Sequence, residues 1–387
     1  MSYGLTKDEE LLKSSVADFV RREHSLERIR ELREDGWGFS RDIWVKMAEL
    51  GWFGLVFPEA LGGFDGTFKE LVIVTEELGK GLMPEPFISA VLVCGNFILL
   101  GGSEETKNKI FPKMIEGNLI MAGGFAEMQS RYYLNDVCTV AKEKNGDFII
   151  SGTKTFVEAA NSADKFIISA RTSGGQYDDG GITVFLIDAE SNGIRLTPVI
   201  TMDGIRRFHV AFDNVKVAAD KILGKKDEGY QLVNEVVSRS MVGLIGEMLG
   251  GMEQAFDIAM KYLKQRMQFG RPIGSFQAIQ HRCVDMWMEI ELSRSTVLET
   301  ALQFDDNAVS REITLSIAKA RCSNAYKYIG SEGIQMHGAI GLTDECDIGL
   351  FLKRAKVAEI TFGDADYHCE RYEMLTGGGE KVGLPIK

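Results

Sequence analysis

The residues with the clearest capacity for chemistry form one short segment between two stretches of helical periodicity. This segment, RMQFGRPIGSFQAIQHR, runs from Arg266 to Arg282 and combines guanidinium, aromatic and amide side chains. Arg makes charge-assisted hydrogen bonds to phosphate oxygens, and planar groups stack on one another. The segment therefore predicts a corner that binds a pyrophosphate and an adenine. Taken alone, it also fits a solvated basic turn.

Other common chemical motifs are missing from the sequence. There is no GxxxxGK[ST] motif, no strand–GxGxxG–helix unit and no GxSxG motif, which argues against the usual nucleotide-binding loops and nucleophile elbows. The six cysteines and five histidines are scattered, without CxxC or HExxH spacing. We therefore expect neither disulfides nor a metal site.

Charge and hydropathy exclude two classes of partner. The formal net charge is -12, and no block of Lys and Arg stands out, so nucleic acid is not an expected ligand, although a local basic groove for one CoA is compatible with this charge. No apolar run reaches the roughly 18–20 residues that a membrane span needs, and the first residues lack an apolar segment after a basic one. These features predict a cytoplasmic chain with no membrane partner.

The elements that must position this chemistry fall into three predicted domains of an α+β chain. Residues 1–120 show helical spacing of apolar residues, residues 121–229 consist of short β-rich runs separated by turn clusters, and residues 230–387 return to helical spacing. The middle runs fit an antiparallel β-barrel or sandwich. A chain of 387 residues is also too long for one compact core.

The first long helix of the last domain is apolar around much of its circumference, which predicts burial inside a bundle or an interface. Four glycines interrupt it, although each costs about 1 kcal/mol of helix propensity. They therefore predict close approach of another helix or of a ligand at Gly243, Gly246, Gly250 and Gly251.

Together, the segment at Arg266, the helix–β–helix order and the stretch IQMHGAIGLTDE resemble the acyl-CoA dehydrogenase family over essentially the whole chain. Supporting stretches are GWFGLVFPEALGGFDGTFKELVIVTEELG, SGTKTFVEAANSADKFIISART and FDNVKVAADKILG. The resemblance implies a C-terminal four-helix bundle and a tetramer. It also implies FAD extended across a subunit interface, with the flavin held by the β domain of one chain and the adenine end by a neighbour.

The half of the site that holds the pyrophosphate and adenine matches the family pattern. The resemblance assigns it two groups of residues, one at the corner and one in a second loop. They are Arg266, Gln268, Phe269 and Gln277, and then Gln335, Gly338 and Gly341.

The half that holds the flavin ring departs from that pattern. Where the family has a TEPGAGSD-like segment, this chain has AEMQSRYY, in which only Glu127 matches. Phe156 can still cover the ring face, but Glu158 stands where a family hydroxyl approaches the flavin. A carboxylate there would oppose the negative charge of reduced flavin unless it were protonated or turned away.

The catalytic base also departs from the family pattern. Removing the α-proton of a thioester needs a carboxylate, and the two positions that supply it in the family hold Phe362 and Ser240 here. Glu247, two helical turns after Ser240, and Asp364 are the candidate replacements. For Glu247, a pair with a buried Arg or Lys is an equally good interpretation.

Within the family, FAEMQSRYYLNDV and the stretch from His337 to Asp366 most resemble the small subunit of pimeloyl-CoA dehydrogenase. This implies a larger paralogous partner in a heterotetramer, as an alternative to a homotetramer, and a dicarboxylyl or alicyclic acyl-CoA substrate. Arg131 and Tyr132 are candidate substrate contacts, because Arg binds a carboxylate bidentately. A structural salt bridge of Arg131 is the alternative.

Three functions remain open from the sequence. The first is a complete dehydrogenase that passes electrons to an electron-transfer flavoprotein; the second is a partner subunit that has lost its own chemistry; the third is a CoA-ligand scaffold. A scaffold has no use for a pyrophosphate corner at Arg266. An oxidase of the same fold is not distinguished from a dehydrogenase by any residue in the sequence.

Overall fold

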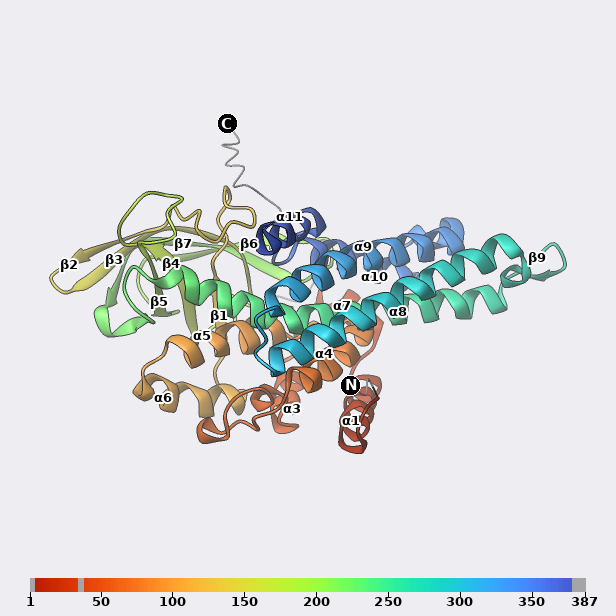
Figure 1. Cartoon of the computed structure of the whole chain (residues 1–387), viewed down its shortest axis with the longest axis horizontal. Helices are drawn as coiled ribbons and strands as arrows, with labels where there is room; N and C mark the ends of the chain where they lie inside the picture. Colours follow the sequence, from red (N-terminus) through yellow and green to blue (C-terminus); the bar gives the residue numbers. More distant parts are fainter. Residues whose placement is uncertain (1–3, 34–37, 378–387) are drawn as a thin grey trace. The chain divides into compact units, whose positions relative to one another are not determined.

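The computed structural model describes residues 4–33 and 38–377, which form two compact units (Figure 1). The first, here called the bundle unit, comprises residues 4–26, 68–83 and 241–377. The second, here called the β unit, comprises residues 27–33, 38–67 and 84–240. Each unit is therefore assembled from segments that are far apart in the sequence.

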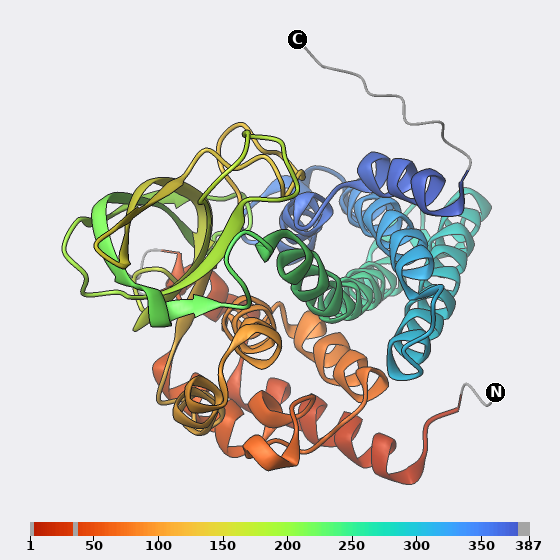
Figure 2. The ribbon, with the colours of Figure 1, turned by 60° about the vertical axis from the view of Figure 1, so that its left-hand side comes forward.

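The bundle unit consists of helices. Figures 1 and 2 show α8 and α9 side by side, and α9 also packs against α10 and α11. At the start of α1, Thr6 and Glu9 form a capping box, which satisfies two free amides of the first turn. The helices are α1 (Lys7–Glu23), α4 (Phe68–Gly81), α7 (Gly229–Gln265, from Met241 onward), α8 (Gln277–Asp305), α9 (Arg311–His337), α10 (Ile348–Ile360) and α11 (Ala365–Thr376).

Close helix packing explains the glycines of α7. A Cβ at Gly246 would clash with Thr75 of α4, and a Cβ at Gly250 would clash with the carbonyl oxygen of Glu76. At Gly251 the clash would be with Tyr326 of α9. The prediction that glycines of this helix mark the approach of another helix is confirmed at these three positions.

The helical part of the β unit is shorter. Ser40 caps α3 by accepting a hydrogen bond from Ile43 N, and Ser103 caps α6 by accepting one from Thr106 N. These caps explain where the two helices begin. The elements are α2 (Leu26–Leu32), α3 (Arg41–Glu49), a π-helix (Phe87–Val93), α5 (Cys94–Gly101), α6 (Glu104–Ile115) and short 3-10 turns at Trp52–Gly54 and Glu59–Leu61.

The sheet of the β unit has the strand order β6-β7-β3-β2-β4-β5-β8, with β1 added beside β4. This order has two ends, so hydrogen bonds do not close the sheet into a barrel, and β1 pairs with β4 in parallel. The strands are β1 (Met121–Gly124), β2 (Val140–Lys144), β3 (Asp147–Glu158), β4 (Lys165–Arg171), β5 (Ile182–Asp188), β6 (Ile194–Ile200), β7 (Arg206–Ala218) and β8 (Ile222–Leu223).

Local sequence explains the pairing of β2 with β3. Asn145 and Gly146 connect them with φ angles of 55° and 84°, the left-handed values that a two-residue hairpin of this type needs. The inward residues of the sheet form one apolar core that includes Phe148, Phe166 and Phe185. This core fixes the faces of β3 and β4.

The structure confirms the predicted order of helices, β-sheet and helices, whereas the boundaries at 120/121 and 229/230 remain predictions. Among the described residues, no helix is long and apolar enough to cross a membrane. The same residues contain no cluster of three His, Cys, Asp or Glu side chains suited to a metal ion.

Candidate functional site

The segment predicted to bind a pyrophosphate and adenine forms a two-stranded hairpin at the end of the α7–α8 pair (Figure 1). Strands β9 (Met267–Gln268) and β10 (Arg271–Pro272) are joined by Phe269 and Gly270, whose φ angles are 53° and 78°. The Phe269 side chain is 91% exposed. A large ring held outward on a left-handed backbone is a costly arrangement, which indicates a function for this turn.

The second predicted loop lies beside this corner. The ring of Tyr262, in the last turns of α7, stacks on His337 at the end of α9, with ring centroids 4.2 Å apart. His337 Nδ1 is hydrogen-bonded to the carbonyl oxygen of Gly333 at 2.7 Å. This stack links the end of α7, just before Arg266, to the Gln335–Gly341 loop, as the resemblance requires.

The donors at this corner suit an anionic ligand with hydrogen-bonding edges. Gly270 and Gly338 both have positive φ and open space where a Cβ would stand, so their backbones are accessible. Gly341, in contrast, is buried against Ile334. The four polar side chains that the resemblance assigns to this corner are all exposed: Arg266, Gln268, Gln277 and Gln335. A guanidinium and three amides fit a pyrophosphate and an adenine.

Glu127 of the predicted flavin half is buried and fully engaged by protein. Its carboxylate pairs with Lys154 Nζ at 2.7 Å and accepts hydrogen bonds from Gln129 Nε2 and from the amides of Cys138 and Thr139. Burial alone would raise its pKa, but Lys154 and these hydrogen bonds lower it to about 2. This arrangement favours a structural role for Glu127 over a contact with the cofactor.

Phe156, the other predicted residue of the flavin half, is available for contact. It lies at a β-bulge of β3, has a φ of 54° and is 52% exposed. Its ring meets that of His209 edge-on, with centroids 5.9 Å apart. The bulge therefore turns an aromatic ring outward from the sheet, as covering a flat ligand requires.

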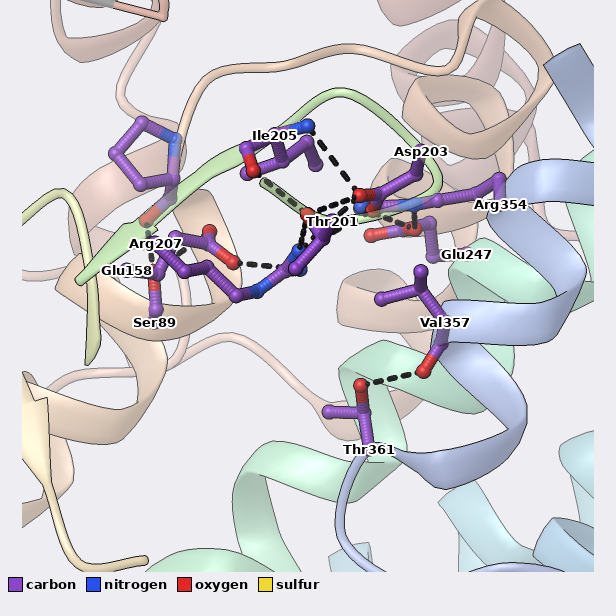
Figure 3. A network of polar contacts seen from close by, with 11 residues as sticks. Ser89, Glu158, Thr201, Asp203, Ile205, Arg207, Glu247, Arg354, Val357 and Thr361 are labelled. Carbon is purple, nitrogen blue, oxygen red and sulfur yellow. Dashed lines mark hydrogen bonds and ion pairs between the residues drawn. The ribbon is translucent and has the colours of Figure 1, made fainter. Parts of the chain in front are cut away.

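Glu158 belongs to a network of polar contacts within the β unit (Figure 3). Its carboxylate accepts a hydrogen bond from Ser89 Oγ at 2.9 Å and pairs with Arg207 Nη2 at 3.1 Å. Arg207 Nη1 in turn lies 3.1 Å from Asp203 Oδ1 and 2.8 Å from Thr201 Oγ1. The carboxylate that was expected to oppose reduced flavin is therefore paired with a guanidinium, which it shares with Asp203.

Glu247, a candidate base, is held in an ion pair within the bundle unit. Arg354 of α10 approaches the same carboxylate oxygen with Nε at 2.7 Å and Nη2 at 2.6 Å (Figure 3). Both side chains are mostly buried. A carboxylate held this tightly by a guanidinium is a poor proton acceptor, so the structure favours the paired interpretation. Ser240 is buried and donates to Val236 O.

Asp364, the other candidate base, caps the N-terminus of α11. Its side chain accepts a hydrogen bond from Tyr367 N at 2.9 Å. Phe362, at the family position of the base, has a φ of 60°, and its carbonyl oxygen lies 3.0 Å from Nε2 of buried His368. The Asp364 cap and the contact of His368 with the Phe362 carbonyl together fix the turn that carries Phe362.

Lys319 of α9 is fully buried and completes this turn. Its Nζ donates to the carbonyl oxygens of Glu359 and Gly363 at 2.9 and 2.6 Å, and to Ser323 Oγ at 3.1 Å. Burial lowers the pKa of Lys319 to about 7. Carbonyls at the end of α10 are a favourable place for an ammonium group because of the helix dipole.

The candidate substrate residues differ in exposure. Arg131 is exposed, and among the described residues its side chain makes no hydrogen bond or ion pair, so the predicted alternative of a structural salt bridge receives no support. Tyr132 is half-buried. Sequence reasoning missed Arg207, Arg354 and Lys319. Each has a partner at least 40 residues away, namely Glu158, Glu247 and Glu359, which no local pattern reveals.

Comparisons with known proteins agree with this fold. Models of the acyl-CoA dehydrogenase N-terminal, middle and C-terminal domains match residues 6–118, 122–215 and 227–374. The chain therefore belongs to the acyl-CoA dehydrogenase family, whose members are FAD-dependent oxidoreductases that act on CH–CH bonds.

Similar proteins include both reductases and dehydrogenases. The 3-(aryl)acrylate reductase of Clostridium sporogenes is 28% identical, over 93% of this chain and 96% of that protein. A subunit of the caffeyl-CoA reductase–Etf complex of Acetobacterium woodii is 27% identical, over 92% and 95%. The structure of glutaryl-CoA dehydrogenase with glutaryl-CoA superposes with a TM-score of 0.91 at 26% identity, covering 99% and 98%.

Proposed function

We propose that this chain is a subunit of an acyl-CoA dehydrogenase that oxidises the Cα–Cβ bond of a CoA thioester and passes the electrons to an electron-transfer flavoprotein. This proposal rests on the corner at Arg266 and the second predicted loop, which are brought together by the stack of Tyr262 on His337. Donors at this corner would hold the pyrophosphate and adenine of FAD from a neighbouring subunit of a homotetramer or heterotetramer.

The residues of this chain would bind and orient FAD and the thioester, while the cofactor would supply the redox chemistry. FAD would supply the hydride acceptor for the β-carbon, and a base would take the α-proton. Phe156 would cover the flavin face, and the Glu158–Arg207 pair would limit repulsion of the negative charge on the reduced ring.

Similar proteins support the electron acceptor and the substrate class. A similar protein forms a complex with Etf, which supports an electron-transfer flavoprotein as the partner. Glutaryl-CoA, the ligand of a similar structure, carries a free carboxylate, which supports a dicarboxylyl thioester over an alicyclic one. The resemblance to the small subunit of pimeloyl-CoA dehydrogenase points to the same class of substrate.

A second candidate function is a partner subunit that donates the adenine corner to a larger paralogue and has no chemistry of its own. The specific observation in its favour concerns the base: Glu247 is paired with Arg354, and Asp364 caps α11. A CoA-ligand scaffold is the weakest candidate, because it leaves the corner at Arg266 unexplained.

Visible spectra separate these functions. The chain would be purified alone and co-expressed with its larger paralogue, and each sample would be mixed anaerobically with a panel of acyl-CoAs. A complete enzyme retains FAD alone and is bleached by its substrate, whereas a partner subunit retains FAD only in the complex. Absence of FAD from both samples would refute both functions.

A further inference from the structure

One exposed cation in the β unit stands on an unusual backbone. Arg131 lies in the turn after Glu127 with a φ of 45°, a left-handed value that non-glycine side chains rarely adopt. Its side chain is exposed and makes no hydrogen bond or ion pair with any residue that the structure describes. Such strain persists where the surrounding structure enforces it, and it concentrates at ligand sites.

The turn that carries Arg131 is fixed from the preceding residues. Ser130 Oγ accepts a hydrogen bond from Glu127 N at 2.9 Å and donates to Glu127 O at 3.1 Å. Gln129 Nε2 donates to the carboxylates of Glu127 and Asp136 at 3.0 and 3.2 Å. At the start of the turn, Glu127 forms an ion pair with buried Lys154.

The segment that follows Arg131 is fixed by a clamp centred on Arg171. The buried Arg171 guanidinium donates to four backbone carbonyls in two segments: Nη2 reaches Asn135 O at 2.7 Å and Gln176 O at 2.8 Å, and Nη1 reaches Asp178 O at 2.9 Å and Gly180 O at 2.6 Å. One side chain thus ties the segment after Arg131 to the 176–180 loop.

Side chains reinforce the same junction. Gln176 Nε2 donates to Asp136 Oδ1 at 2.7 Å, and Asn135 Nδ2 donates to Asp179 Oδ1 at 2.9 Å. These contacts join two loops that would otherwise move separately. They hold the left-handed turn in one conformation, and the Arg131 guanidinium on this turn makes no polar contact with the described part of the chain.

From this geometry we infer that Arg131 is an anchor for an oxyanion of the CoA thioester, and that Arg171 is the residue that positions it. The inference rests on the proposed function, which makes a CoA thioester the ligand. A guanidinium binds carboxylate and phosphate oxygens alike, in bidentate geometry. The oxyanion therefore comes either from a free carboxylate of the acyl group or from a phosphate of CoA.

Binding by calorimetry tests the inference with the full chain and its FAD. The ligands are glutaryl-CoA, butyryl-CoA and the pantetheine thioester of butyrate, compared in wild type, Arg131→Gln and the matched control Arg195→Gln. Arg195 is an exposed Arg of the same unit, paired only loosely with Asp213 at 3.6 Å. Arg131→Gln is expected to raise the Kd about ten-fold, and Arg195→Gln less than two-fold, since a lost charge-assisted contact is worth about a factor of ten.

The ligands identify the oxyanion. If Arg131→Gln loses affinity for glutaryl-CoA alone, the oxyanion is the acyl carboxylate. If it loses affinity for both CoA thioesters but not for the pantetheine thioester, the oxyanion is a phosphate of CoA. Equal binding of every ligand by wild type and Arg131→Gln overturns the inference while leaving the proposed function intact. A wild-type protein that binds no CoA thioester overturns both.

The positioning role of Arg171 is tested separately from its role in stability. Arg171→Lys, and the milder Gln176→Ala, are expected to raise the Kd of the same ligands in the wild-type protein. In the Arg131→Gln protein they should raise the Kd less than two-fold further, because they act through Arg131. If either variant weakens binding equally in both backgrounds, Arg171 has only a general structural role and the positioning claim is wrong.

Discussion

At the scale of single residues, exposed aromatic side chains contrast with buried charges that are paired within the protein. Phe156 and Phe269 project outward on left-handed backbones, and Phe362 has the same backbone strain. Glu127 and Glu158, by contrast, are each paired with a cation of the same unit. Residue type alone could not separate these two groups, since the partners lie far away in the sequence.

The buried pair of Glu127 and Lys154 makes a prediction about stability. Lys154→Met leaves an unpaired buried carboxylate and should reduce the free energy of unfolding by about 3–5 kcal/mol, measured by urea denaturation at pH 7. The double variant Glu127→Gln/Lys154→Met should recover part of this loss. Additive losses in the double variant would contradict the pairing.

The same pair predicts a pH dependence. Because the pKa of Glu127 is lowered from 4.5 to about 2 in the folded chain, its contribution is complete above pH 4.5 and is lost as the pH falls through about 2. Urea denaturation of wild type and Glu127→Gln as a function of pH should show a difference in unfolding free energy that shrinks over this range. A constant difference would contradict the lowered pKa.

Phe362 allows a gain of function to be tested. If the turn at Phe362 faces the thioester as the family resemblance implies, Phe362→Glu should supply the missing base and raise the rate of anaerobic flavin reduction by an acyl-CoA at least about ten-fold, within the usual range for a general base. Phe362→Gln is the uncharged control. Equal rates for the two variants would show that this turn does not face the α-carbon.

At the scale of elements, close packing of α7 against α4 holds the bundle unit together. In an open helix, Gly→Ala stabilises by up to about 1 kcal/mol. Gly250→Ala should instead destabilise by about 1–3 kcal/mol, because its Cβ would clash with the carbonyl of Glu76. Thermal unfolding measures this effect.

Gly349 of α10 supplies the matched control for that measurement. A Cβ at Gly349 would meet only ordinary contacts, at 3.6 and 3.9 Å. Gly349→Ala should therefore leave the melting temperature unchanged or raise it. Equal effects of the two substitutions would show that α4 does not approach α7 this closely.

How far the elements follow from the sequence depends on how local their causes are. Turn clusters and β-rich runs are local signals, and they predicted strands separated by turns, as found where Asn145 and Gly146 connect β2 with β3. The open end of the sheet and the parallel pairing of β1 with β4 depend on contacts between distant segments. No local pattern encodes them, so the sequence predicted an antiparallel barrel or sandwich without deciding whether the sheet closes.

At the scale of the whole molecule, we propose that this chain contributes to a dinucleotide site that it shares with a neighbouring subunit. The corner at Arg266 was predicted from its residue types together with the family resemblance, and its role in binding remains a prediction. The base could not be predicted, because both family positions are altered and the nearby carboxylates, Glu247 and Asp364, have other partners.

The most direct test of the central claim compares the binding of FAD and FMN, because FMN lacks the adenylate half that the corner at Arg266 would hold. Equilibrium dialysis of the purified complex would measure both flavins with wild type and with Arg266→Gln. We predict that wild type binds FAD more tightly than FMN. Arg266→Gln should raise the Kd of FAD about ten-fold or more and leave the Kd of FMN unchanged. Equal affinity of wild type for the two flavins, or an equal loss of both in Arg266→Gln, would contradict the account.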